Sequence, residues 1–124
     1  MGRCGDTSGE TLDTGWRVME SLGREVVVLR RSIEGFIGNR LQHALYREAL
    51  YLVEQGVATP RDIDRAVLSS FGPRVSSVGV WEYYASCGLE LQKGVQTYLY
   101  PTLCGAEGPQ EPLLRALAEG KRGP

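Results

Sequence analysis

A chain of 124 residues is long enough to bury the core of one domain but not of two. Its formal net charge is −1 and it has no long run of Lys or Arg, which argues against binding to nucleic acid or to an anionic membrane. No stretch reaches the roughly 18 consecutive apolar residues of a membrane span, and the start lacks a signal-peptide core, so we expect a cytoplasmic protein.

The three cysteines do not form a recognisable site. Cys4, Cys87 and Cys104 include no C-x-x-C pair, and the chain holds one histidine, so we expect no metal site. An odd number of cysteines without a framework is typical of reduced thiols in a cytoplasmic protein. None has a base adjacent in sequence, and we therefore expect no nucleophilic cysteine.

The first predicted element is a helix over about residues 8–22. Thr7 and Glu10 have the spacing of a capping box, and Gly23 stands where a C′ glycine belongs. The β-branched run EVVVLR, residues 25–30, then predicts a single strand. Because a single strand cannot satisfy its own backbone groups, it must pair with a second copy or with a domain outside this chain.

A long helix is predicted from about Gly35 to Gly56. Its apolar residues recur at steps of three and four and cover more than one face, which is typical of a helix at the centre of a bundle or against a dimer partner. A further helix should begin at Thr59-Pro60, since Thr59 is a good N-cap and Pro60 fits the first helical position. Asp62 favours the positive end of that helix.

The second half of the chain alternates loops and short helices. Composition predicts a loop over residues 69–79 and another over 104–111. The predicted helices are a short aromatic one over 78–87, one over 89–103 that Pro101 loosens near its end, and a last one over 112–119. The fold class is therefore all-α, with about six helices and one short strand near the N-terminus.

The residue types alone leave several roles open. His43 lies one turn after Asn39 and could perform acid–base chemistry beside an oriented substrate, or it could be an ordinary surface or interface residue. Trp81, Tyr83 and Tyr84 could line a ligand cleft or belong to the core. Gly35-x-x-Gly38 is too short to indicate a phosphate-binding loop, and the chain contains no dinucleotide fingerprint.

Glu48 is a carboxylate within an otherwise apolar helical stripe. Such a group must be satisfied where it is buried. We expect a structural role, in which Glu48 accepts a hydrogen bond from the backbone of a neighbouring element or from an arginine.

Residues 22–67 resemble the start of the C-terminal domain of 3-hydroxyacyl-CoA dehydrogenases. The family pattern is a valine-rich strand, G-F-I-x-N-R, then E-A and a glycine, then D-I-D-x-A. The matching residues are Gly35, Phe36, Ile37, Asn39, Arg40, Glu48, Ala49, Gly56, Asp62, Ile63, Asp64 and Ala66. Further on, Gly79, Glu82, Gly88 and Leu89 hold their places, whereas Val80, Ala85 and Glu90 replace the usual Pro, Asp and Asp. The resemblance covers about residues 8–119.

The resemblance implies a helical bundle similar to the C-terminal domain of 6-phosphogluconate dehydrogenase. Residues 1–33 would be a linker helix and the last strand at the far edge of a Rossmann sheet. Residues 34–124 would form the helical domain for substrate binding and dimerisation. The chain then resembles a fragment of a longer enzyme.

The resemblance also implies an NAD-dependent oxidoreductase of fatty-acid metabolism. The intact enzyme would transfer a hydride between C3 of a 3-hydroxyacyl-CoA and nicotinamide, and would be a homodimer through the helical domain. In the family, the Rossmann domain supplies the nicotinamide-binding glycines and a catalytic His–Glu pair, and His43 does not align with that histidine. This chain alone is therefore expected to be inactive and to bind no cofactor, and the acyl-CoA would bind together with the missing domain.

Asn39 is the candidate catalytic-site residue by this resemblance. The family asparagine lies at the interdomain cleft near substrate and nicotinamide, where an amide can hold a hydroxyl or keto oxygen. Arg40 is expected to be structural and to pair with Glu48 or Asp64. Two alternatives remain: the same domain of an L-gulonate-type sugar-acid dehydrogenase, and a helical dimerisation module without catalytic activity.

Overall fold

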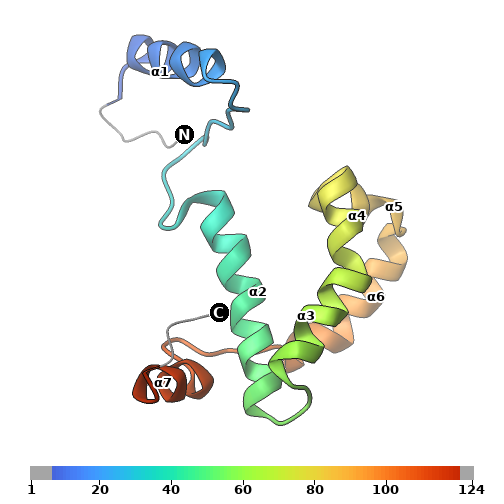
Figure 1. Ribbon diagram of the computed structural model, residues 1–124. Helices are drawn as coiled ribbons and strands as arrows, with labels where there is room; N and C mark the ends of the chain where they lie inside the picture. The colour runs from blue at the N-terminus through green and yellow to red at the C-terminus, as the bar shows by residue number, and fades with distance from the viewer. Residues whose placement is uncertain (1–6, 121–124) are drawn as a thin grey trace. The chain divides into compact units, whose positions relative to one another are not determined.

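The computed structural model describes residues 7–120, which form seven α-helices and one 3-10 helix (Figure 1). In chain order they are α1 (Gly9–Ser21), α2 (Phe36–Glu54), α3 (Pro60–Ser69), α4 (Phe71–Val78), α5 (Val80–Ser86), α6 (Leu89–Leu99), η1 (Tyr100–Thr102) and α7 (Glu111–Ala118). The all-α class is confirmed. None of the described helices is long and apolar enough to cross a membrane.

The chain divides into two compact units, Met1–Ala44 and Leu45–Pro124, and the division falls within α2. Cys4, one of the three cysteines considered above, lies outside the described residues. The other two, Cys87 and Cys104, are free thiols.

In the first unit, the predicted strand is wrong. Residues 24–29 adopt no regular secondary structure, because residues 7–120 contain no second strand with which they could form a ladder. Helix α1 begins one residue later than the predicted capping box requires: its N-cap is Ser8, whose hydroxyl accepts from the Thr11 N–H at 3.2 Å. Gly23, with φ +67°, ends α1 as predicted.

Helix α2 ends and helix α3 begins as their sequence signals predict. Gly56 has φ +67°, and the Val57 N–H donates to the Leu52 carbonyl in the bond that closes a Schellman motif. At the start of α3 the capping box is complete, because the Asp62 N–H donates to Thr59 Oγ1 and the Thr59 N–H donates to the Asp62 carboxylate.

The loop predicted over residues 69–79 is wrong, because residues 71–78 form α4. Pro73 is the third residue of that helix, where the backbone N–H has no intrahelical acceptor and its absence costs little. A Cβ on Gly72 would come within 2.7 Å of the Val67 carbonyl oxygen, so the corner between α3 and α4 requires glycine. Composition misled the prediction because serine, glycine and proline are also common in first helical turns.

The remaining helices follow one another closely. Gly79 and Gly88, both with positive φ, separate α4, α5 and α6. Helix α6 ends at Leu99, four residues earlier than predicted, and Pro101 lies in η1. Helix α7 starts one residue earlier than predicted. Very few side chains are buried in the described part of the chain: Leu29, Cys104 and Gln110.

Candidate functional site

The head of α2 contains a sharp turn followed by the first helical residues. Gly35 has φ +76° and Phe36 has φ +50°, so two consecutive residues adopt left-handed backbone conformations before the helix proceeds. Such a conformation is unfavourable for phenylalanine by about 1 kcal/mol or more. The segment therefore needs contacts that hold Phe36 in place.

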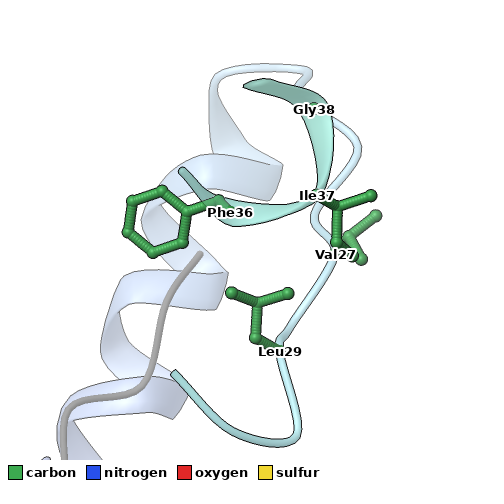
Figure 2. Close-up of a pocket in the computed structure, with 5 residues that line it drawn as sticks. All are labelled: Val27, Leu29, Phe36, Ile37 and Gly38. Carbon is green, nitrogen blue, oxygen red and sulfur yellow. The ribbon is translucent and has the colours of Figure 1, made fainter. Parts of the chain in front are cut away.

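An apolar pocket of about 260 Å³ lies at this turn. Figure 2 shows its lining, which comes from residues 24–29 and from the start of α2: Val27, Leu29, Phe36, Ile37 and Gly38. Leu29 is one of the few buried residues of the described chain, although Phe36 and Ile37 remain about half exposed. The valine-rich run thus packs beside the glycine turn instead of forming a strand.

Asn39 follows directly on the pocket residue Gly38, in the first turns of α2. Its side chain is exposed, and its amide makes no hydrogen bond with another residue in the range 7–120. An amide carries two N–H donors and an acceptor oxygen. The side chain predicted to face a ligand is therefore polar, accessible and without a hydrogen-bond partner among the residues that the structure describes.

Arg40 has the structural role predicted for it, but through a different partner. Its Nη1 donates to the backbone carbonyl of Glu34 at 3.4 Å. The expected pairing with Glu48 or Asp64, which belong to the second unit, stays a prediction. The Arg40 side chain also runs past Gly35, where a Cβ would lie 3.3 Å from Arg40 Cγ.

His43 lies one turn after Asn39 on α2, is exposed, and is not among the residues that line the pocket. An acid–base role for His43 therefore stays an untested alternative. Within residues 7–120 no group of three or more His, Cys, Asp or Glu side chains could hold a metal ion. The same residues contain no parallel sheet and no glycine-rich strand–helix turn.

Glu48, in the second unit, belongs to a polar cluster that is fully hydrogen-bonded. Its Oε2 accepts from the Cys104 backbone N–H at 2.8 Å, which confirms the predicted structural role. Gln110 Nε2 donates to the Arg47 carbonyl at 3.0 Å and to Cys104 Sγ at 3.7 Å. Cys104 and Gln110 are buried, and no described buried side-chain polar atom lacks a partner.

This cluster fixes residues 104–110 against the second half of α2. The sequence offered no direct signal for Gln110, since a glutamine in a glycine-rich and proline-rich segment is typical of a loop surface. Its burial follows from its position as N-cap of α7, where the chain turns back toward α2.

The aromatic residues of α5 form two separate contacts instead of a core. Trp81 is 78% exposed and stacks on Tyr84, with ring centroids 5.7 Å apart. The Tyr84 hydroxyl accepts from Gln96 Nε2 on α6 at 2.8 Å, and the Tyr83 hydroxyl accepts from Arg74 Nη1 on α4 at 2.8 Å. The core interpretation is wrong for Trp81. The pocket at the head of α2 is not lined by these aromatic rings.

Comparison with known proteins identifies the domain. The family model of the 3-hydroxyacyl-CoA dehydrogenase C-terminal domain matches residues 35–123. Over 117 residues the chain is 31% identical to 5-formyl-3-hydroxy-2-methylpyridine 4-carboxylate 5-dehydrogenase of Mesorhizobium japonicum; this covers 94% of the chain and 38% of that protein. It is 43% identical over 82 residues to L-carnitine dehydrogenase of Pseudomonas aeruginosa, covering 66% of the chain and 26% of that enzyme.

A solved structure agrees with the sequence relatives. The crystal structure of the pyridine-carboxylate dehydrogenase, described as an NAD+ dependent dismutase, matches 98% of this chain and 40% of its own chain, with a TM-score of 0.92 and 30% identity. The chain thus spans well under half the length of these relatives. It belongs to the family of the 3-hydroxyacyl-CoA dehydrogenase C-terminal domain.

Proposed function

We propose that this chain is the helical domain of an NAD-dependent dehydrogenase that oxidises the hydroxyl group of a small hydroxy acid. The relatives that support oxidation of a hydroxyl group are dehydrogenases of L-carnitine. The pyridine-carboxylate relative acts on a formyl compound and supports only NAD-dependent dehydrogenation of a small carboxylate. L-carnitine carries its hydroxyl on the carbon β to a carboxylate, the same relation that a 3-hydroxyacyl group has to its thioester. NAD would be held by the part of the protein that the relatives have and this chain does not cover.

The observation that carries the proposal is the amide of Asn39. It lies next to the apolar pocket, in the resembling family's G-F-I-x-N-R motif, with no protein hydrogen-bond partner in residues 7–120. We propose that Asn39 binds the reacting oxygen of the substrate and so orients the carbon that loses hydride. Its contribution would be positioning and hydrogen bonding, with no proton transfer of its own.

A second candidate substrate is a 3-hydroxyacyl-CoA, because that is the activity named by the matching family. A sugar acid of the L-gulonate type is a third possibility that follows from the same domain. All of these reactions convert a secondary alcohol to a ketone and reduce NAD, so they share one assay.

The proposal includes a homodimer through the helical domain. Leu91 and Tyr98 lie seven residues apart on the same face of α6, and both are more than 60% exposed. Exposed apolar side chains on one helix face favour contact with another protein surface. Sedimentation at micromolar concentration should give the mass of a dimer, and a strictly monomeric mass would contradict this part of the proposal.

The activity is tested by NADH formation with the protein encoded by the complete reading frame. L-carnitine, L-gulonate and 3-hydroxybutyryl-CoA should be compared as substrates, with the 124-residue chain alone as the control. We expect turnover by the complete protein and none by the chain alone. Turnover by the chain alone, or no turnover of any hydroxy acid by the complete protein, would overturn the proposal and favour a non-catalytic dimerisation module.

A further inference from the structure

Arg74 on α4 is held by a single neighbour, Tyr83 on α5. Its Nη1 donates to the Tyr83 hydroxyl at 2.8 Å, and its guanidinium carbon lies 5.8 Å from the centroid of the Tyr83 ring. The hydrogen bond uses an N–H at the edge of the guanidinium. The second contact is a cation–π interaction, in which the positive charge lies over the ring. The hydrogen bond to Tyr83 raises the pKa of Arg74, so this side chain stays a cation.

The positive charge of Arg74 has no counterion in the described part of the chain. Glu82 is adjacent to Tyr83 in sequence but forms no ion pair with Arg74, unlike Glu111, which pairs with Arg115. Arg74 is exposed, and among residues 7–120 only Tyr83 accepts a hydrogen bond from it. Most of its five N–H donors are therefore available to a ligand.

Tyr83 adds a donor of its own. Its hydroxyl oxygen accepts from Arg74, so its proton is not used in that bond and can be donated elsewhere. Tyr83 is half-buried, which restricts the position of the ring. A held guanidinium and a phenolic O–H side by side present several donors and one positive charge at one place.

We propose that Arg74 and Tyr83 form a binding site for a carboxylate. The two oxygens of a carboxylate match donors from a planar guanidinium and a neighbouring hydroxyl, and its single negative charge balances that of Arg74. Because Tyr83 already fixes the guanidinium, little side-chain freedom is lost on binding. Both L-carnitine and the pyridine carboxylate of the relatives named above keep a free carboxylate, whereas an acyl-CoA does not keep one at the acyl group.

The inference concerns the carboxylate group, whether a substrate or a separate effector carries it, and it does not depend on Asn39, because Arg74 and Tyr83 both belong to the second unit and Asn39 belongs to the first. Binding itself does not require turnover. The two proposals can therefore fail independently: a protein that binds carboxylates without NADH formation refutes the activity alone, and an active protein indifferent to Arg74 refutes the site alone.

The test is titration calorimetry of the complete protein with L-carnitine and with acetate, and with acetamide as the uncharged probe. In Arg74→Gln we expect Kd for the carboxylates to rise about tenfold or more, with a smaller rise in Tyr83→Phe and in Arg74→Lys, which keeps the charge but loses the planar fork. The matched controls are Arg65→Gln on α3 and Tyr100→Phe on η1, both at exposed positions. Circular dichroism shows which variants fold. If Arg74→Gln does not fold, the Kd values of Arg74→Lys and Tyr83→Phe for the carboxylates test the site instead.

An unchanged carboxylate Kd in folded Arg74 and Tyr83 variants would overturn the site, as would an equal loss in the controls or equal binding of acetamide. Steady-state kinetics then separate the two sources. A raised KM for L-carnitine with kcat retained, and an unchanged KM for 3-hydroxybutyryl-CoA, supports the substrate carboxylate. A raised Kd for acetate with both KM values unchanged supports a separate carboxylate ligand at the same site.

Discussion

The polar side chain at the head of α2 and those around its second half differ in whether they are hydrogen-bonded to other residues. At the head, Asn39 stands beside an apolar pocket with an amide that bonds to no described residue. Two turns later, Glu48 accepts a backbone N–H, and the neighbouring Gln110 is buried with two acceptors. The contrast separates an exposed amide with no hydrogen-bond partner among residues 7–120 from side chains whose hydrogen bonds join chain segments.

The backbone shows the same division. The head of α2 contains Phe36 in a left-handed conformation, which costs free energy and places the side chain at the pocket. The end of α2 has an ordinary glycine C-cap at Gly56. An unfavourable turn beside an unpaired amide is typical of a functional site, whereas satisfied caps and paired carboxylates are typical of structure.

The largest expected effect on stability comes from Glu48. In Glu48→Ala the partly buried Cys104 N–H loses its acceptor, and we expect the free energy of unfolding to fall by about 1–3 kcal/mol. Glu48→Gln keeps an acceptor oxygen and should lose less. Urea denaturation of the complete protein measures both; equal loss in the two variants would show that charge, and not the hydrogen bond, is what matters at Glu48.

A smaller effect is expected at the glycine turn. Gly35→Ala must adopt φ +76° and bring a Cβ to 3.3 Å from Arg40, so it should lower the free energy of unfolding by about 1–2 kcal/mol. Gly38 is helical, and its added Cβ would meet nothing within 4 Å. Gly38→Ala should therefore stabilise by up to about 1 kcal/mol. Thermal unfolding of Gly35→Ala and Gly38→Ala measures both effects. Destabilisation by both variants would contradict the account of the turn.

The smallest effect is the pH dependence of the α3 capping box. The hydrogen bond from the Thr59 hydroxyl lowers the pKa of Asp62 below its usual value near 3.8. A carboxyl group with a lowered pKa stabilises the folded state above its unfolded pKa and loses that contribution as pH falls through the folded pKa. The decrease in Tm below about pH 4 should thus be slightly smaller in Asp62→Asn than in the natural sequence; identical pH profiles would refute a contribution from Asp62.

Sequence signals predicted the elements whose ends are set by local chemistry. Thr59 and Asp62 fixed the start of α3, and Gly23 and Gly56 fixed the ends of α1 and α2, because capping depends on neighbouring residues alone. The role of Glu48 was also predictable, since a carboxylate in an apolar stripe needs a donor. The identity of the donor to Glu48 was not predictable, because Cys104 lies 56 residues away in the chain.

The sequence predictions that were wrong also have physical causes. A valine-rich run predicts a strand only if another strand pairs with it, and residues 7–120 supply none. Pro73 and Gly72 suggested a loop, yet both fit the first turn of α4. The pairing of Arg74 with Tyr83 and the exposure of Trp81 depend on how α4 and α5 meet, which periodicity does not specify.

The most direct test of the account is the effect of Asn39→Ala on both activity and stability in the complete protein. If Asn39 orients the reacting oxygen, kcat/KM for the hydroxy acid should fall by about 10- to 100-fold while the urea midpoint stays unchanged. Gln55→Ala, which removes an exposed amide at the other end of α2, should change neither quantity. Unchanged kinetics in Asn39→Ala, or a loss of activity matched by a loss of stability, would contradict the assignment of Asn39 to the site.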